Sequence, residues 1–299
     1  MTRTILVTGA TGAQGGSVSR HLLAEGGWKI RGFTRKPESE PARALAAAGV
    51  EIVQGDLDDR GSIVRALEGC DALYGVTSFW EHFEHEADHG RNIVDAAAEA
   101  GTPDIIISSL PDVSGMTEGE LSVPHFDLKA QVERYARAKL PQAAYLHIAF
   151  YYDNFLAFTP PRRQDDGTYV FGFPQGDTDL AGVGAEDVGG VVVGMLRDLD
   201  RFRGDVAWAV GDDIPASRYA EIMSSVLDLP IVYQHVPRET FAALGFPGAD
   251  DLAQMFDFYR RFVPSRKPQI EQSRELYPAI QDFETWARRH REMLRSALQ

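Results

Sequence analysis

The sequence of 299 residues is long enough for one large hydrophobic core or two smaller ones, and its 44% hydrophobic content is ordinary for a globular protein. A formal net charge of -14 argues against a broad nucleic-acid surface, which needs a basic face. The single cysteine, Cys70, excludes an internal disulfide and favours a reducing cytoplasm, where we expect it to be a small buried hydrophobe. No apolar run approaches the roughly 20 residues of a membrane span, and the sequence starts directly on a strand pattern without a visible signal peptide.

The chain opens with a short apolar run at 4–7, followed by three glycines spaced three apart and then by a helical pattern. A strand that enters a helix through such a turn predicts a dinucleotide site, with a purely structural turn as the alternative. The first glycine allows the turn, the second lets the backbone approach a pyrophosphate, and the third lets helix and strand pack closely. The positive end of the helix then holds the phosphates. The residues predicted to contact the cofactor here are Gly9, Ala10, Thr11, Gly12, Ala13, Gln14 and Gly15.

Strand and helix patterns then alternate through the first half of the chain. We expect strands at 28–34, 51–54, 72–76, 104–108 and 145–150, and helices at 40–48, 62–67 and 86–100. Near-continuous apolar strands separated by helices predict a parallel sheet that is covered on both faces. The expected fold is therefore α/β, with a Rossmann-type doubly wound sheet that binds its ligands at the carboxyl ends of the strands.

The regular alternation stops near residue 155, and a turn-rich segment follows at 160–167. We expect a dinucleotide-binding Rossmann domain at 1–155 and a smaller α/β lobe for a substrate or partner at 156–299, with some strands shared with the main sheet. Its amphipathic helices could serve a homodimer, although amphipathicity alone more often means an intramolecular core. The later elements are predicted as helices at 185–199, 217–227 (capped by Ser217), 250–261 and 283–294, and as strands at 205–210 and 231–236.

Basic residues follow the second predicted strand, at the point that faces the adenine ribose in a dinucleotide fold. Arg35 suits a bidentate contact to a phosphate, and Lys36 adds charge. NADP(H) is therefore predicted over NAD(H), and a solvated basic pair is the alternative. After the third strand, Asp56 is placed to accept a hydrogen bond from the adenine amino group while Leu57 packs on the ring; an ordinary turn is an equal alternative.

Thr77, Ser78 and Phe79 follow the fourth strand at the mouth of the crevice, where their backbone could line the ribose and the nicotinamide. The segment 81–89 is rich in histidines and carboxylates but lacks a clean ligand spacing, so we interpret it as a solvated helix start and predict no metal site. Asn154 is a candidate amide donor after the sixth strand. The cofactor residues predicted in that turn are Tyr151, Tyr152, Asp153 and Asn154.

The glycine spacing and the word Thr-Gly-Ala-Thr-Gly at 8–12 resemble the short-chain dehydrogenase/reductase superfamily. That resemblance implies a Tyr-x-x-x-Lys pair, in which tyrosine gives a proton to the carbonyl and lysine binds the nicotinamide ribose. Here His125 stands at the tyrosine position, four residues before Lys129, so both side chains share a helix face. Imidazole can donate a proton near neutral pH, which makes His125 a candidate acid, with a packing or capping histidine as the alternative. Lys129 is the expected ribose ligand.

The longer word Gly-Ala-Thr-Gly-Ala-Gln-Gly-Gly-Ser-Val at 9–18 resembles the NmrA-like family of NADP(H)-binding proteins, and within it the branch of the human NADPH sensor. Further matching words lie at 53–56, 125–127, 244–249 and 251–256. The resemblance implies a Rossmann domain with a smaller lobe, NADP(H) in the cleft, and often no demonstrated catalysis.

Two functions stay open at this point. The missing tyrosine and the resemblance favour a regulator that binds NADPH or NADP⁺ and signals the redox state to a protein partner. The cleft residues Lys129 and His125 favour an NADPH-dependent reductase of a carbonyl, quinone or imine, because the cofactor carries the hydride chemistry. A structural protein that has lost its cofactor is a third interpretation, and the glycine turn and Arg35 argue against it.

Overall fold

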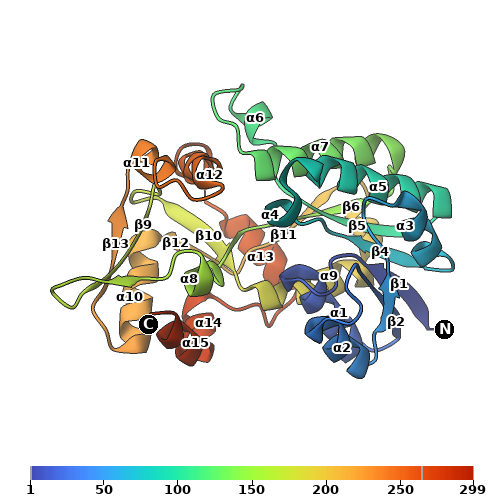
Figure 1. The fold of residues 1–299 in the computed structure, drawn as a ribbon, viewed down its shortest axis with the longest axis horizontal. Helices are drawn as coiled ribbons and strands as arrows, with labels where there is room; N and C mark the ends of the chain where they lie inside the picture. The colour runs from blue at the N-terminus through green and yellow to red at the C-terminus, as the bar shows by residue number, and fades with distance from the viewer. Residues whose placement is uncertain (1, 264, 299) are drawn as a thin grey trace.

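The computed structural model describes residues 2–263 and 265–298. Figure 1 shows two lobes, with the N-terminal end on the first lobe and the C-terminal end on the second. Within the described residues, no helix combines the length and the apolar character that a membrane crossing requires.

Seven strands form the sheet of the first lobe in the order β11-β6-β5-β4-β1-β2-β3, and every neighbouring pair is parallel. The strand order reverses between β1 and β4, so the carboxyl ends of these strands open a crevice there. This arrangement confirms the predicted Rossmann-type α/β fold. The strands are β1 (Arg3–Val7), β2 (Trp28–Thr34), β3 (Glu51–Gln54), β4 (Ala72–Gly75), β5 (Asp104–Ser109), β6 (Ala144–Ile148) and β11 (Val206–Ala209).

Helices cover both faces of this sheet, and each face has its own hydrophobic core. Successive side chains of β1 point to opposite faces of the sheet, so Ile5 and Val7 belong to one core and Leu6 belongs to the other. Cys70 is buried in the second of these cores, as expected, and its burial raises the pKa of its thiol. One face carries α1 (Ala13–Glu25), α2 (Glu40–Ala47), α9 (Val188–Arg197) and α13 (Lys267–Leu276); the other carries α3 (Arg60–Leu67), α5 (Glu86–Ala100) and α7 (Pro124–Lys139).

The second lobe packs two three-stranded sheets and several helices around an aromatic core. Phe155, Phe173, Tyr219 and Phe283 are all fully buried there. Its sheets have the orders β12-β10-β7 and β13-β9-β8, with β7 (Phe150–Tyr151), β8 (Arg162–Arg163), β9 (Tyr169–Phe173), β10 (Asp179–Val183), β12 (Asp212–Pro215) and β13 (Ile231–His235). Its helices are α8 (Asn154–Ala157), α10 (Ala216–Leu227), α11 (Arg238–Ala242), α12 (Ala249–Phe262), α14 (Phe283–Arg289) and α15 (Arg291–Ala297).

Short helical segments connect these elements. They are α4 (Phe79–His82), η1 (Phe83–His85), α6 (Val113–Met116), η2 (Ala185–Asp187) and η3 (Leu199–Phe202). Figure 1 places α4 near the middle of the molecule, between the two lobes, and α6 beside the start of α7.

Several predicted boundaries differ from the structure. The sixth strand ends at Ile148, and its expected last residue, Phe150, pairs instead with β10 in the second lobe. Ser217 is not a cap, because α10 already begins at Ala216, with Pro215 in an extended conformation before it. The helix expected at 283–294 is two helices that meet at His290, the capping residue of both.

Segments from the second half of the chain complete the first lobe. β11 extends the sheet beyond β6, and α9 packs on α1. The contact is close because the Ser17 hydroxyl donates to the carbonyl of Glu186 at 2.6 Å and accepts from the amide of Gly189 at 3.0 Å. The sheet of the first lobe is therefore completed by residues far beyond position 155.

Candidate functional site

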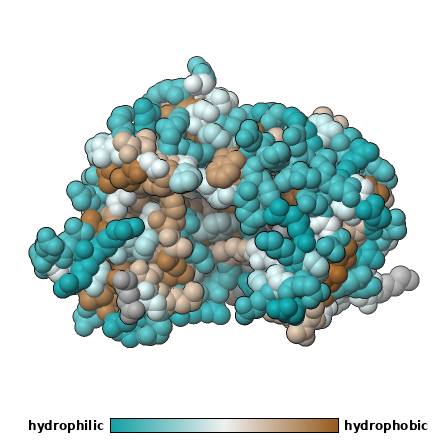
Figure 2. All heavy atoms as spheres, viewed as in Figure 1, coloured by the Kyte–Doolittle hydropathy of each residue, from teal (hydrophilic) through white to brown (hydrophobic). Residues whose placement is uncertain are grey.

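A cavity of about 900 Å³ runs along the carboxyl ends of the sheet strands and reaches the second lobe. Figure 2 shows the molecule hollowed between the two lobes at this place. One cavity therefore gathers residues that lie far apart in the sequence. The predicted site residues that line it are Gly9, Thr11, Gly12, Ala13, Gln14, Gly15, Arg35, Lys36, Asp56, Leu57, Thr77, Ser78, Phe79, His125, Lys129, Tyr151 and Asn154.

Three other predicted cofactor residues lie outside the cavity lining. Ala10 is fully buried in the core of the first lobe. Tyr152 is also fully buried and packs its ring against Phe283, with the centroids 5.1 Å apart, because it points away from the cavity that Tyr151 lines. The Asp153 carboxylate accepts a hydrogen bond from the amide of Ala185 at 2.9 Å and so fastens the turn between the lobes.

The glycine turn packs so closely on the start of α1 that a side chain would not fit at Gly15. Gly9 has a positive φ of 56°, and a Cβ on Gly15 would lie 2.4 Å from the carbonyl oxygen of Gly9. The turn is also fixed to the neighbouring strand, because the Thr8 hydroxyl accepts from the amide of Val76 at 2.7 Å and donates to its carbonyl at 2.8 Å. The N-terminal amides of α1 thus border the cavity without a covering side chain, as an anion site at a helix N-terminus requires.

Gln14 is held by two hydroxyl groups whose residues lie far from it in the sequence. Its side-chain oxygen accepts hydrogen bonds from Tyr74 on β4 and Ser108 on β5, both at 2.8 Å. These partners lie 60 and 94 residues away in the chain. The amide group of Gln14 is thereby fixed at the cavity wall.

The basic pair after β2 lies at the edge of the cavity, as the sequence predicts for a phosphate contact. The Arg35 guanidinium is 3.2 Å from the Glu81 carboxylate of α4, and both side chains are exposed. Burial, together with the nearby Arg35 charge, lowers the pKa of His82. An anionic group bound at this end would compete with Glu81 for Arg35 and gain from the adjacent Lys36.

At the end of β3, Asp56 and Leu57 line the cavity as predicted for an adenine contact. The Asp56 carboxylate also accepts from the amide of Asp58 at 3.1 Å, which is the ordinary turn role that the sequence left as the alternative. The side-chain amide of Asn92 donates to the carbonyl of Leu57 at 2.7 Å and ties this turn to α5. The geometry allows Asp56 to hold its turn and still present its second oxygen to a ligand.

Lys129 lies in the cavity wall and pairs with the carboxylate of Glu86, which was not predicted as a site residue. Its ammonium group donates to the Thr77 hydroxyl at 2.9 Å and the Thr77 carbonyl at 3.3 Å, and forms an ion pair with Glu86. Glu86 is fully buried, and one of its carboxylate oxygens has no hydrogen-bond partner in the described part of the chain. The ammonium therefore has three protein acceptors, and a ribose hydroxyl must share or replace one of them.

The interpretation of 81–89 as a solvated helix start is wrong for two of its polar residues. Glu86 is fully buried, and His89 is 1% exposed with its Nε2 2.9 Å from the Asp58 carboxylate. The reason is that α5 starts at Glu86 and turns this face of its first turn toward α3 and α7, so the polar side chains find partners there. Across residues 2–263 and 265–298, no group of three or more ligating side chains is arranged to hold a metal ion.

His125 lines the cavity from the first turn of α7 and is held by a carboxylate of the other lobe. Its backbone amide donates to one oxygen of Asp251 at 3.0 Å, and its Nδ1 forms a hydrogen bond with the other oxygen. Both side chains are nearly buried. Asp251 was missed as a site residue because 126 positions separate it from His125.

A comparison with known families matches the NmrA-like family over residues 1–287. A curated relative, the NmrA-like family domain-containing oxidoreductase notA of Aspergillus sp. strain MF297-2, is 35% identical over 246 residues, which cover 75% of this chain and 72% of the relative. Among solved structures, the negative transcriptional regulator NmrA in complex with NAD superimposes with a TM-score of 0.87 at 24% identity and covers 100% of this chain and 99% of its own. The NADPH-dependent quinone oxidoreductase QOR2 of Escherichia coli in complex with NADPH superimposes with a TM-score of 0.73 at 24% identity, covering 94% and 98% of the two chains.

Proposed function

This chain belongs to the NmrA-like family, and we propose that it is an NADP(H)-dependent oxidoreductase that reduces a carbonyl, quinone or imine. The observation that carries the proposal is the open cavity of about 900 Å³, which continues from the glycine turn past Lys129 and His125 to the second lobe. Beyond the residues that would hold a dinucleotide, the cavity is lined by side chains of the second lobe such as Phe158, Pro247 and Met255, where a substrate of a reductase could bind. The relative notA, which carries the name of an oxidoreductase, supports the same class of function.

The residues present fit NADP(H). The glycine turn and the N-terminus of α1 would hold the pyrophosphate, since Gly9, Gly12 and Gly15 all line the cavity there. Arg35 and Lys36 would bind the 2′-phosphate, and Lys129 would hold the nicotinamide ribose. The bound cofactor supplies hydride. The protein's own part is to orient the substrate in the cavity, exclude water, and provide a proton.

The test is NADPH oxidation by the purified chain with a panel of aldehydes, enones, quinones and imines, with cofactor binding measured by calorimetry in the same samples. We expect saturable turnover that falls at least tenfold in Lys129→Met. Lys139→Met is the matched control on the same helix, because Lys139 is exposed at its end and pairs with Asp95. Cofactor binding without turnover across the whole panel would contradict the proposal.

A redox-state sensor is the second candidate, because His125 stands where related reductases use a tyrosine. The structural similarity to the regulator NmrA, which has been solved with NAD and with NADP, fits that role. A sensor needs a difference in affinity or conformation between the reduced and oxidised cofactor. Calorimetry with NADPH and NADP⁺ tests this, and equal affinities without any change in hydrogen exchange would exclude it.

A further inference from the structure

The side of the cavity that faces the second lobe is apolar and aromatic, and it is built by both lobes. The lining side chains of this kind are Trp80, Phe126, Phe150, Phe158, Met255 and Tyr259. Aromatic side chains pack on flat π systems in offset or edge-to-face arrangements, so such walls favour a flat, conjugated ligand. The two ionisable side chains that line the cavity here, His125 and Lys129, are each paired with a carboxylate. The ligand that fits this side is therefore uncharged.

We propose that this side of the cavity binds a flat, uncharged, conjugated carbonyl compound, that His125 donates the proton to its oxygen, and that Asp251 positions His125. The proposal rests on the reductase function proposed above and adds the substrate class and the proton donor.

One carboxylate holds both the backbone and the ring of His125. Asp251 accepts from the backbone amide of His125 at 3.0 Å and is hydrogen-bonded to Nδ1. Nε2 has no hydrogen-bond partner among the described residues, and the side chain lines the cavity. A carboxylate on Nδ1 holds an imidazole in one orientation, so the opposite nitrogen is the one that exchanges a proton with a ligand.

The reduction adds hydride to the carbonyl carbon and a proton to the carbonyl oxygen. The carbonyl carbon of the substrate receives hydride, the carbon–oxygen π bond breaks, and its electron pair moves to the oxygen. That oxygen takes the proton from Nε2 of His125 and becomes a hydroxyl group. His125 donates from the form with both ring nitrogens protonated, so the transfer leaves a neutral imidazole. The imidazole takes up one proton from the solvent before the next turnover, while Asp251 keeps the ring oriented throughout.

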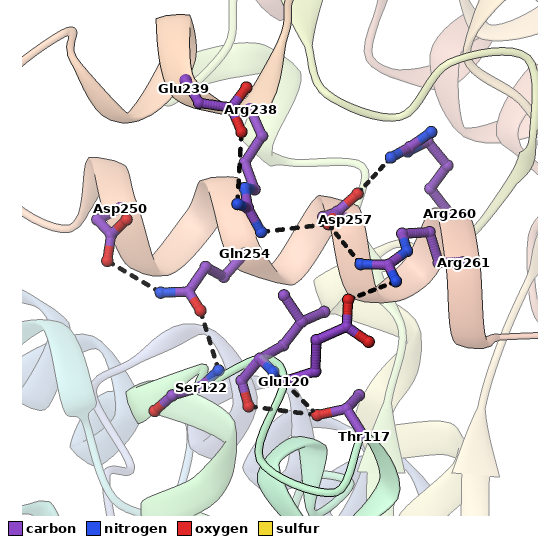
Figure 3. A network of polar contacts seen from close by, with 11 residues as sticks. Thr117, Glu120, Ser122, Arg238, Glu239, Asp250, Gln254, Asp257, Arg260 and Arg261 are labelled. Carbon is purple, nitrogen blue, oxygen red and sulfur yellow. Dashed lines mark hydrogen bonds and ion pairs between the residues drawn. The ribbon is translucent and has the colours of Figure 1, made fainter.

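The donor is assembled across the interface of the lobes, because His125 is on α7 and Asp251 is on α12. Figure 3 shows the neighbouring contacts that hold α12 against the segment before α7. There the amide of Ser122 donates to the side chain of Gln254 at 2.9 Å, and Glu120 pairs with Arg261. Trp80 meets Gly248 just before α12, where a Cβ would lie 2.4 Å from the indole ring.

The first experiment compares substrates and variants of the full chain with NADPH as reductant. We expect kcat/KM for trans-cinnamaldehyde and 2-methyl-1,4-naphthoquinone to exceed that for propanal and glyoxylate at least 100-fold. Asp251→Asn should lower kcat at least tenfold with KM changed less than twofold, and Asp251→Glu should recover part of the loss. Asp250→Asn is the matched control, since Asp250 is exposed on the same turn and binds only Gln254 in the described structure. In His125→Ala, added imidazole should restore turnover.

A second readout does not depend on turnover. Cinnamamide is flat, uncharged and inert to hydride, and its binding is followed by quenching of tryptophan fluorescence in the presence of NADP⁺. We expect Phe158→Ala to weaken this binding at least fivefold and Leu244→Ala to leave it unchanged, because Phe158 lines the cavity whereas Leu244, which is also exposed, does not.

The outcomes separate the two proposals. Efficient turnover of propanal or glyoxylate without preference for the conjugated compounds would overturn this inference and leave the reductase function standing. Loss of turnover in Asp251→Asn through KM alone would overturn the positioning role. No turnover of any compound would overturn the reductase function, and Phe158-dependent binding of cinnamamide would then still support the ligand class.

Discussion

Lys129 and Glu86 form an ion pair in a place that water scarcely reaches. The Lys129 side chain is 10% exposed and the Glu86 side chain 0%. Removing two charges from water is costly, and their mutual attraction offsets this cost only when both remain. The pair therefore keeps a charged lysine in the cavity wall, while its net contribution to the stability of the fold is small.

A double-mutant cycle tests this pair. Glu86→Leu alone should lower the free energy of unfolding by about 3–5 kcal/mol, because it leaves the Lys129 ammonium buried without its carboxylate. Glu86→Leu with Lys129→Met should cost clearly less than the sum of the two single changes. Urea unfolding of the four proteins measures the coupling, and additive losses would show that the two charges do not interact.

Arg35 is the residue that we expect to decide which dinucleotide the site prefers. Arg35→Ala should weaken NADPH binding about tenfold to 100-fold, as expected for loss of a charge-assisted contact worth roughly 1.5–3 kcal/mol. NADH, which lacks the 2′-phosphate, should change less than threefold. Calorimetry with both cofactors measures this, with Arg43→Ala on the exposed face of α2 as control. Equal losses for both cofactors would place the phosphate elsewhere.

Helix α9 shows how an element with poor intrinsic propensity is stabilised by its neighbours. It contains Gly189, Gly190 and Gly194, and glycine disfavours a helix by about 1 kcal/mol per residue. These glycines let other segments approach: a Cβ on Gly189 would lie 2.3 Å from the carbonyl oxygen of Ser17 on α1, and one on Gly194 would lie 2.3 Å from that of Leu276 on α13. The helix forms because both sides pack closely.

Gly189→Ala should therefore destabilise the protein although alanine is the better helix former. We expect a loss of about 1–3 kcal/mol, typical of an overpacked core, since backbone atoms of α1 must move. Gly61→Ala is the control, because its Cβ would meet only the ends of the Asp59 and Arg65 side chains. Chemical denaturation measures both, and a gain in stability for Gly189→Ala would contradict the close packing.

Elements with a local signal could be predicted from the sequence, and contacts between distant elements could not. The apolar strands and the glycine turn follow from spacing within a few residues, and the cavity contains most of the residues predicted there. Glu86 and Asp251 were missed because their partners lie 43 and 126 positions away. Tyr152 was misplaced because successive side chains in the turn after β6 point to opposite sides, and the sequence does not say which side faces the cavity.

At the scale of the whole molecule, the chain passes repeatedly between the lobes. β7 to β10 belong to the second lobe, α9 and β11 return to the first, β12 to α12 belong to the second again, and α13 returns once more. The first lobe thus depends on segments from three parts of the sequence.

A fragment of residues 1–155 should therefore fail to fold on its own. It would lack β11 and α9, which leaves the edge of β6 unpaired and uncovers the face of α1 that packs on α9. We expect urea unfolding without a cooperative transition and no protection of β1 or β6 amides from hydrogen exchange, compared with the full chain. A sigmoidal transition together with cofactor binding would contradict this.

The interleaved path also constrains how relatives of this protein can exchange properties. A single recombination event transfers one continuous stretch of sequence, whereas the apolar side of the cavity is built from residues near positions 80, 126, 150–158 and 247–259. A graft with one crossover would carry over part of that wall and separate His125 from the carboxylate that holds it. We therefore expect ligand preference in this architecture to change through scattered point substitutions rather than through exchange of one continuous segment.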